Sequence, residues 1–312
     1  MAALLSIIIP AYNEEESINK VIETLGIVLS SVSFSYEIIF VDDGSKDSTW
    51  KQIMMLAKSN KNIAGIKFSR NFGKESALLA GLEHASGSAC VIMDCDLQHP
   101  PETLIEMFEI WQKGGVDIVE GIKKSRGSEC IIYKKFANFF YYLIEHLGNI
   151  SLKDSSDFQL LDRRVVDIVI NLPERQRFFR AMSAWVGFTR KQVAFKVEPR
   201  QGGVSKFNFY KSTKYALTNI TSFSSAPMQF VTFMGVAFFI AAIILSVQTL
   251  YRWFLLRAVE GFTTVILLLL IIGSMLMLSM GIIGLYIGKI YEEIKFRPQY
   301  LIEDQINANK GV

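Results

Sequence analysis

Residues 4–14 read LLSIIIPAYNE and residues 89–98 read ACVIMDCDLQ, and in both stretches an apolar run ends abruptly in polar or acidic residues. Residues 37–45, EIIFVDDGS, repeat the pattern. Short apolar runs rich in isoleucine and valine are typical of buried β-strands. These stretches therefore predict strands with polar and acidic residues at their carboxyl ends.

Strand-like and helix-like segments alternate over residues 4–119. The expected strands are Leu4–Ile9, Glu37–Val41, Ile63–Phe68, Ala89–Met93 and Val116–Val119. The expected helices lie near residues 15–30, 47–58, 74–85 and 101–113. This alternation predicts an α/β fold with a Rossmann-like, mostly parallel sheet and helices on both faces. Ligands bind at the carboxyl ends of the strands in such sheets, so the residues after each strand form the candidate site.

The composition excludes several classes of protein. Of the 312 residues, 50% are hydrophobic and 20% are charged, which excludes low-complexity disorder. The net charge is only +3, from 33 basic and 30 acidic residues, so we expect no nucleic-acid partner. The three cysteines, an odd number without zinc-ligand spacing, indicate a reducing compartment and no disulfide scaffold.

Two long uncharged stretches lie near the C-terminus. No charged residue occurs between Tyr215 and Tyr251 or between Gly261 and Gly288. Because about 20 apolar residues cross a bilayer, we expect two transmembrane helices, at about 228–250 and 262–288. Their length and lack of charge disfavour two buried helices of a soluble domain. The short link between them makes the pair an antiparallel hairpin.

The distribution of charge predicts the orientation of this hairpin. Lysine and arginine are more frequent on its flanks than in its connecting loop, which places the flanks in the cytoplasm. We therefore expect a multi-pass protein of the inner (cytoplasmic) membrane. Its expected parts are a cytoplasmic α/β domain at 1–205, a juxtamembrane amphipathic helix at 206–225, the hairpin at 226–290 and a cytoplasmic tail at 291–312. Residues 133–147 are a further candidate for contact with lipid headgroups.

Asp94 and Asp96 are the strongest local signal. Two carboxylates two residues apart can hold a hard divalent cation through oxygen ligands. Mg²⁺ binds few carboxylates and completes its shell with water and substrate phosphates, which suits a nucleotide diphosphate. No glycine-rich loop of the GxxxxGK[ST] or GxGxxG kind is present, which disfavours an ATPase or a nicotinamide enzyme. Turn and helix-cap chemistry is the alternative for Ser45, Asp47 and Ser48.

Four stretches resemble the family 2 glycosyltransferases of GT-A fold. They are SIIIPAYNEEESI (6–18), IIFVDDGSKDST (38–49), FSRNFGKESALLAGL (68–82) and MDCDLQHPPE (93–102). With the C-terminal hairpin they resemble the polyprenyl-phosphate glycosyltransferases, the bactoprenol glucosyltransferase branch above all. Dolichyl-phosphate mannose synthases and undecaprenyl-phosphate aminoarabinose transferases belong to the same group. The resemblance covers residues 4–300, nearly the whole chain.

The resemblance implies a role for each matched residue. The nucleotide-sugar site would comprise Pro10, Ala11, Tyr12, Glu14, Asp42, Asp43, Arg70, Lys74, Asp94 and Asp96. The ligands of a Mg²⁺ or Mn²⁺ cofactor would be Asp94, Asp96 and Gln98. The catalytic residues would be Asp157 and Asp96. The acceptor phosphate of the lipid would meet Arg200, Ser205 and Lys206.

The sequence allows two roles for each of three sets of residues: Asp157, the histidines and the arginines at 175–180. A phosphate acceptor is already anionic at neutral pH, so Asp157 would orient the sugar or support charge at the anomeric carbon, with a general base as the alternative. The histidines are expected to be structural, with His99 a distant metal candidate. Arg175, Arg177 and Arg180 form either a phosphate-binding group or a solvated basic face.

The resemblance also implies an inverting sugar transfer at the cytoplasmic membrane face. The donor would be UDP-glucose and the acceptor polyisoprenyl (undecaprenyl) phosphate, giving a lipid-linked sugar for modification of lipopolysaccharide O-antigen or another surface glycan. GDP-mannose and a UDP-linked modified arabinose are alternative donors.

A processive polymer synthase is disfavoured because residues 174–179, ERQRFF, lack the QxxRW motif. A non-catalytic nucleotide-sugar-binding scaffold for a flippase is the alternative of another class. The lipid bilayer, further copies of the chain and a flippase are the other expected partners.

Overall fold

The computed structural model describes residues 3–30, 32–123, 156–175, 177–196, 226–254 and 261–308. These residues form two compact units. The sheet unit contains the described residues up to 196 together with 297–308, and the helical unit contains 226–254 and 261–296.

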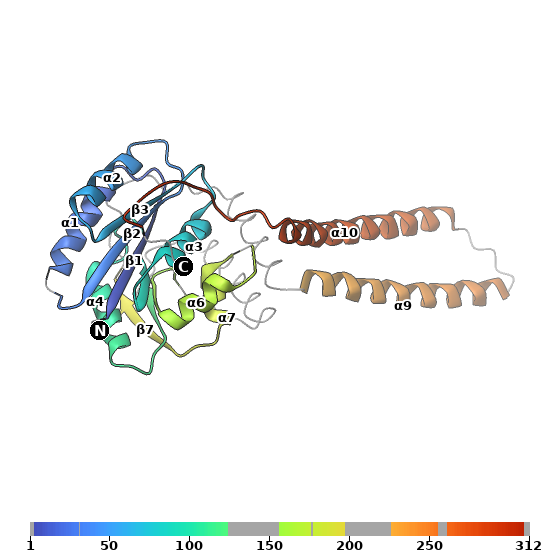
Figure 1. Ribbon diagram of the computed structural model, residues 1–312. Helices are drawn as coiled ribbons and strands as arrows, with labels where there is room; N and C mark the ends of the chain where they lie inside the picture. Colours follow the sequence, from blue (N-terminus) through green and yellow to red (C-terminus); the bar gives the residue numbers. More distant parts are fainter. Residues whose placement is uncertain are drawn as a thin grey trace. The chain divides into compact units, whose positions relative to one another are not determined.

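A mixed β-sheet forms the centre of the sheet unit (Figure 1). Its strands are β1 (Leu4–Ala11), β2 (Ser35–Asp42), β3 (Ile63–Phe68), β4 (Ala89–Ile92), β5 (Ile118–Lys123), β6 (Gln159–Asp162), β7 (Arg190–Phe195) and β8 (Ile302–Ile306). Their order across the sheet is β7-β5-β6-β4-β1-β2-β3-β8. The pairs β1–β2, β1–β4, β2–β3 and β5–β7 are parallel, and β3–β8, β4–β6 and β5–β6 are antiparallel. The carboxyl ends of β1, β2 and β4 therefore meet at one edge.

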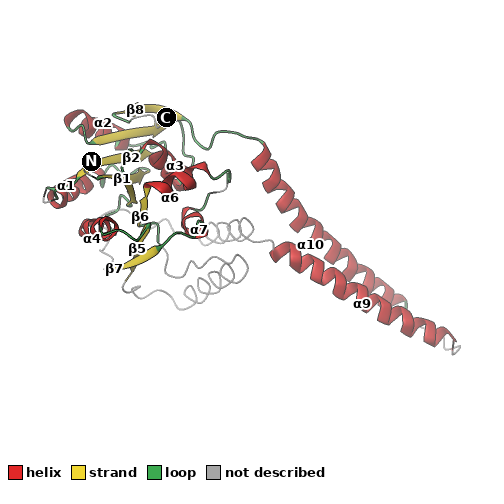
Figure 2. Cartoon of the chain, turned by 60° about the horizontal axis from the view of Figure 1, so that its bottom comes forward, coloured by secondary structure: helices red, strands yellow, loops and turns green. Residues whose placement is uncertain are grey.

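Helices cover both faces of this sheet (Figures 1 and 2). They are α1 (Ile18–Leu29), α2 (Thr49–Ser59), α3 (Lys74–His84), α4 (Pro101–Gln112), α6 (Arg163–Asn171) and α7 (Phe179–Trp185). On one face α1, α2 and α4 bury side chains such as Leu25, Ile53 and Phe108. On the other face α3, α6 and α7 bury Leu78 and Val166. Because both faces are covered, the central strands are apolar at successive positions rather than at alternate ones.

The expected α/β fold is confirmed, and the five expected strands overlap β1 to β5. β5 begins at Ile118, later than the expected Val116, and the Asp117 side chain just before it accepts hydrogen bonds from the Thr189 backbone N–H and hydroxyl. The strands β6, β7 and β8 were not expected. β6 has only four residues, and the sequence of β8, IEDQI, is mostly polar. Short and polar strands give little hydrophobic signal, since packing on the sheet selects them.

The chain re-enters the sheet unit at residue 297 and adds β8 to the outer edge of β3. The Tyr300 ring stacks on Phe68 with the ring centroids 4.9 Å apart. The Lys67 amino group lies 2.8 Å from a carboxylate oxygen of Glu303. The stretch expected only as a tail thus contains a strand. This strand pairs with backbone groups of β3 that would otherwise form an open sheet edge.

The helical unit consists of α9 (Ala226–Phe254) and α10 (Phe262–Ile294). The two helices lie side by side and run in opposite directions (Figures 1 and 2). Within the part of the chain that the structure describes, one stretch, Ile271–Ile294, is long and apolar enough to cross a membrane. It has a mean hydropathy of 2.0 and none of it is buried, whereas Val231–Leu245 is a shorter apolar segment. Large apolar side chains such as Phe239 and Met277 are exposed along both helices, so this surface needs a partner other than water.

Candidate active site

A cavity of about 370 Å³ opens at the carboxyl ends of β1, β2 and β4. It is lined by Pro10, Ala11, Tyr12, Glu14, Asp43, Asn71, Gly73, Lys74, Ala77, Asp94, Cys95 and Asp96. Of the nucleotide-sugar residues assigned from the sequence, all but Asp42 and Arg70 are in this lining. Segments far apart in the chain converge here because parallel strands end at the same edge of the sheet.

Hydrogen bonds between a backbone and a side chain join the loops after β1 and β2. The Asn13 N–H donates to Ser45 Oγ, and the Lys46 N–H donates to Asn13 Oδ1, each at 2.9 Å. Asn13 has a φ of +53°, a left-handed conformation that asparagine tolerates better than most residues. Ser45 therefore has the turn role that the sequence left open. The joined loops hold Tyr12, which is 42% exposed, at the rim of the cavity.

Asp42 and Asp43 have different surroundings. Asp43 accepts hydrogen bonds from the N–H groups of Phe72 (2.6 Å) and Gly73 (2.9 Å), so it holds the loop before α3. Asp42 is fully buried, and its Oδ1 accepts from the Ser45 N–H. Its Oδ2 has no hydrogen-bond partner among the described residues. Burial raises the pKa of both carboxyls. Asp42 thus keeps an unused hydrogen-bonding group at the end of β2.

The loop after β4 brings Asp94 and Asp96 into the cavity. Asp96 Oδ1 accepts from the Gln98 N–H at 3.1 Å, and the intervening Leu97 has a φ of +56°. A branched residue rarely adopts this conformation, and the buried Leu97 side chain, 5% exposed, keeps it there. The Asp94 N–H donates to Nδ1 of His99, which is buried behind the loop. His99 therefore supports the loop that presents the two carboxylates.

Arg70 and Gln98 are absent from the cavity lining. The Arg70 guanidinium packs over the Phe72 ring, 4.4 Å from the ring centroid. Gln98 meets Asp96 through its backbone N–H, as described above. The structure therefore gives Gln98 a part in shaping the acidic loop and does not place its side chain in the wall of the cavity.

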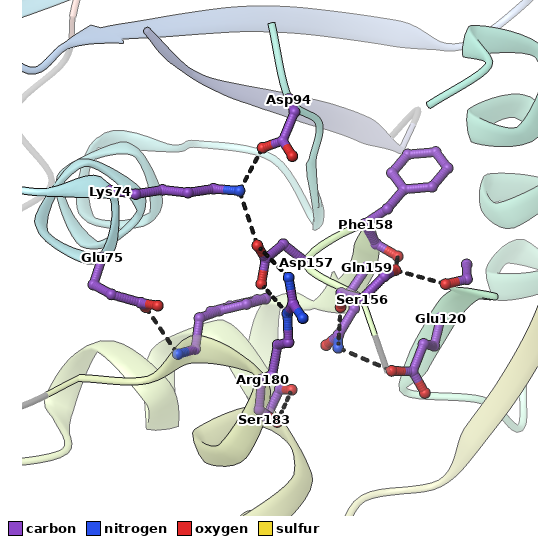
Figure 3. A network of polar contacts seen from close by, with 12 residues as sticks. Lys74, Glu75, Asp94, Glu120, Ser156, Asp157, Phe158, Gln159, Arg180 and Ser183 are labelled. Atoms are coloured by element: carbon purple, nitrogen blue, oxygen red, sulfur yellow. Dashed lines mark hydrogen bonds and ion pairs between the residues drawn. The ribbon is translucent and has the colours of Figure 1, made fainter. Parts of the chain in front are cut away.

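Asp157, which is 8% exposed, is joined to the acidic pair by Lys74 (Figure 3). Asp157 Oδ2 lies 2.8 Å from Lys74 Nζ, and the same nitrogen lies 2.6 Å from Asp94 Oδ1. Arg180 makes a two-point contact, with Nε 2.6 Å from Asp157 Oδ1 and Nη2 2.9 Å from Oδ2. Two cations therefore hold the Asp157 carboxylate, and one of them is shared with Asp94.

Charge outweighs burial in setting the protonation of this cluster. Burial by itself would raise the pKa of Asp157, but Lys74 and Arg180 hold that pKa well below its usual value. Burial would also raise the pKa of Asp94, and the positive charge of Lys74 reverses the effect. Burial would lower the pKa of Lys74, and the two aspartates raise it instead. At neutral pH both carboxyls are ionised and the lysine is protonated.

A buried hydrogen-bond network supports the Asp157 segment from behind (Figure 3). Gln159 Nε2 donates to the Ser156 carbonyl oxygen at 2.9 Å. The Phe158 ring stacks on His99, with the ring centroids 4.7 Å apart. The segment that carries Asp157 is therefore fixed against the loop that carries Asp94, a contact that no local sequence pattern predicts.

The three arginines considered together in the sequence have separate positions. Arg177 donates to carbonyl oxygens at the C-terminal end of α6, so it caps that helix. Arg175 donates to the carbonyl oxygen of Arg297. Of the three, Arg180 reaches the acidic cluster. Sequence spacing could not identify it, because its contact with Asp157 depends on how α7 packs.

Glu75 is a further carboxyl near the cluster. It accepts a hydrogen bond from the Phe179 N–H at 2.9 Å, which ties the start of α3 to the start of α7. Burial raises its pKa from 4.5 to about 7, and the charge of Asp157 contributes. The Phe179 N–H and the charges of Lys74 and Arg180 oppose this shift without cancelling it.

Glu75→Gln should therefore remove a pH dependence of stability. Because the folded pKa exceeds the unfolded one, the wild type loses stability as the pH rises from 4.5 to about 7. The quantity to compare is the free energy of unfolding of Glu75→Gln minus that of the wild type. We expect this difference to be on the order of 2 kcal/mol larger at about pH 8 than at about pH 5. Thermal unfolding at the two pH values measures this difference. Glu106→Gln, on the exposed side of α4, controls for the loss of a surface charge, and an advantage independent of pH would refute the raised pKa.

A larger opening of about 880 Å³ lies at the opposite edge of the sheet, near the amino ends of β5 and β7. Its charged residues are paired with one another. An Arg164 nitrogen lies 2.6 Å from an Asp117 oxygen, and Asp162 accepts from the Trp111 indole N–H. The smaller cavity, with its carboxylate and ammonium groups at the strand ends, is therefore the candidate active site.

The donor set for a metal ion consists of two carboxylates. In the described ranges, no group of three or more His, Cys, Asp or Glu side chains is arranged to hold a metal ion. Asp94 and Asp96 nevertheless line one cavity, and the Lys74 ammonium already shares the Asp94 carboxylate. Two hard oxygen donors fit an ion that takes its other ligands from water and phosphate. The residues expected at the acceptor phosphate, Arg200, Ser205 and Lys206, lie outside the described residues, as do residues 133–147 and 206–225.

Comparisons with known proteins agree with the sequence motifs. Residues 6–182 match the family model described as glycosyl transferase family 2. An uncharacterized glycosyltransferase of Synechocystis sp. is 39% identical over 97% of this chain and 96% of the relative. The SfII prophage-derived bactoprenol glucosyl transferase of Shigella flexneri is 36% identical over 98% of this chain and 99% of the relative. Among solved structures, glucosyl-3-phosphoglycerate synthase from Mycobacterium tuberculosis covers 70% of this chain and 77% of its own, with 19% identity and a TM-score of 0.47. The chain is thus a glycosyltransferase and belongs to glycosyltransferase family 2.

Proposed function

We propose that this enzyme transfers glucose from UDP-glucose to a polyprenyl phosphate such as undecaprenyl phosphate, with inversion at the anomeric carbon. The observation that carries the proposal is the cluster of Asp94, Lys74, Asp157 and Arg180 at the cavity of a family 2 enzyme. Relatives named bactoprenol glucosyl transferase support the sugar and the acceptor, and the exposed apolar helices support a lipid acceptor. The product would be a lipid-linked glucose for modification of a surface glycan such as O-antigen.

The nucleotide would lie along the ends of β1 and β2, with its diphosphate near the end of β4. Pro10, Ala11, Tyr12 and Glu14 line that path, which supports their assignment. Asp42 does not line the cavity, but its Oδ2 has no hydrogen-bond partner among the described residues. That oxygen could accept a hydrogen bond from the nucleotide base. Asp43 would act indirectly through the loop that it holds. The exposed Arg70 would have to turn toward the nucleotide to take part.

Asp94 and Asp96 would hold Mg²⁺ or Mn²⁺ beside the diphosphate. When bound, such an ion neutralises charge on a nucleotide diphosphate leaving group. The two carboxylates on one loop and their shared cavity support this assignment. Gln98 would shape this loop through its backbone N–H, which donates to Asp96. Asp96 would take part in catalysis as a ligand of the ion.

Asp157 would act as an electrostatic and orienting residue. A phosphate acceptor has a second pKa of about 6 by analogy with phosphorylated side chains, so it is largely anionic at neutral pH and needs no base. The Asp157 carboxylate is engaged by Lys74 and Arg180, and its pKa is depressed, which makes it a weak proton acceptor. Its negative charge can stabilise positive charge that develops at the anomeric carbon.

The acceptor keeps this reaction at a membrane. We extend the proposal to α9 and α10 as two transmembrane helices in the inner membrane, with residues 1–205 as the cytoplasmic catalytic domain and 206–225 as a juxtamembrane helix. The uncharged stretches and the lysine and arginine on their flanks support this orientation.

The acceptor phosphate would meet Arg200, Ser205 and Lys206. A lipid-linked product used at the cell surface must cross the bilayer, so a flippase would be the next partner. Further copies of the chain are proposed as a homo-oligomer.

A transfer assay with matched donors and acceptors tests the proposal. Membranes that contain the protein are incubated with labelled UDP-glucose, GDP-mannose or a UDP-linked modified arabinose, together with undecaprenyl phosphate. We expect lipid-soluble label from UDP-glucose. Undecaprenol, which lacks the phosphate, is the matched control and should remain unlabelled. Label from another donor would replace glucose in the proposal, and no lipid-soluble label from any donor would reject the function.

A further inference from the structure

The Lys74 ammonium group lies between the carboxylates of Asp94 and Asp157. Its amino nitrogen lies 2.6 Å from Asp94 Oδ1 and 2.8 Å from Asp157 Oδ2 (Figure 3). We propose that Lys74 is an internal counter-ion that competes with the divalent cation for Asp94, so that the cation binds tightly when a nucleotide diphosphate draws Lys74 away. This inference rests on the proposed function, because it takes Asp94 as a metal ligand.

The two cations of the cluster differ in how firmly they are placed. Arg180 holds both oxygens of Asp157 through a planar two-point contact and is 30% exposed. Lys74 is 39% exposed and uses a single nitrogen at the end of a flexible four-carbon chain. It also lines the cavity, so a diphosphate would come within its reach. If Lys74 leaves, Arg180 still neutralises Asp157.

The small number of acidic ligands supports a coupling between metal and nucleotide. Outside the masked segments, no third His, Cys, Asp or Glu joins Asp94 and Asp96 as a metal ligand. With Lys74 on Asp94, a free divalent ion would meet a positive charge at one of its two carboxylates. A diphosphate adds oxygen ligands for the ion and supplies a new anionic partner for Lys74. The two ligands should therefore strengthen each other's binding by the same factor.

Manganese binding without and with UDP tests this role. Free Mn²⁺ is measured by electron paramagnetic resonance on the purified full-length chain. We expect the wild type to bind Mn²⁺ about tenfold or more tightly with UDP than without it. Lys74→Met should bind Mn²⁺ alone about tenfold more tightly than the wild type and should lose most of the gain from UDP. Lys74→Arg keeps the charge and should bind Mn²⁺ alone as weakly as the wild type. Lys58→Met removes the same charge from the exposed side of α2 and is the matched control.

The possible results separate the two proposals. If Asp94→Asn abolishes Mn²⁺ binding but Lys74→Met binds Mn²⁺ no more tightly than the wild type, the counter-ion role is wrong and the metal site stands. If the wild type binds no Mn²⁺ even with UDP, the metal site is wrong and the counter-ion role fails with it. Should Lys74→Met not fold, Lys74→Gln carries the same expectation, because it removes the charge and keeps a hydrogen-bond donor for Asp157.

Discussion

Replacing Asp94 by asparagine should slow sugar transfer by about 10³-fold. The substitution keeps the shape of the side chain but removes the negative charge that would hold the divalent ion beside the leaving diphosphate. Asp94 lines the cavity and lies 2.6 Å from Lys74 Nζ. Asparagine has one neutral carbonyl oxygen in place of the carboxylate, so it is a weak ligand for a hard cation. Initial rates of lipid labelling at saturating UDP-glucose measure the effect.

A matched aspartate outside the site controls for the general effect of the substitution. Asp167, on α6, is paired with Arg163 and lies away from the cavity lining. Asp167→Asn should leave the rate within about twofold of the wild type. Thermal unfolding of both variants checks that the protein is folded. An Asp94→Asn enzyme that keeps a rate within tenfold of the wild type would exclude a role for this carboxylate in the chemical step.

Asp157→Asn should slow transfer by about 10²-fold and leave the shape of the pH–rate profile unchanged. Because Lys74 and Arg180 hold the pKa of Asp157 well below its usual value, this carboxyl stays ionised throughout the neutral and mildly acidic range. An acidic limb near pH 6 would then come from the acceptor phosphate and would persist in the variant. Rates between about pH 5 and about pH 8 for both enzymes provide the measurement.

The variant also separates the two roles considered for Asp157. Loss of the acidic limb in Asp157→Asn would identify the residue as a general base and would reject the electrostatic role. Arg180→Lys is the companion variant, because it keeps the positive charge and loses the two-point contact with Asp157. We expect its rate to fall between those of the wild type and Asp157→Asn.

The parts of the fold that could be predicted are those buried on both faces. β1 and β2 lie in the middle of the sheet, and each contains an uninterrupted apolar run, residues 7–9 in β1 and 38–41 in β2, that identifies it directly. β6 is short, and β8 is a polar strand at the edge that packs through neighbours such as Tyr300. Such strands depend on tertiary contacts that a local pattern does not contain.

The candidate site divides in a similar way. Asp94 and Asp96 could be found because they follow a buried strand at the edge where ligands bind. Asp157 was reached through the family resemblance, since its own segment has no distinctive spacing. The contacts that give it a role, from Lys74 and from Arg180, join parts of the chain separated by 83 and 23 residues. Contacts between residues so far apart in the chain form only when the protein folds, so a local sequence pattern does not predict them.

The metal dependence of sugar transfer by the purified protein tests whether a divalent ion at Asp94 and Asp96 is needed for the reaction. Labelled UDP-glucose and undecaprenyl phosphate are supplied, the divalent ion is removed with a chelator, and Mg²⁺ or Mn²⁺ is then restored. We expect lipid-soluble label to fall to background with the chelator and to return with the ion. Transfer at full rate in the presence of excess chelator would contradict this expectation.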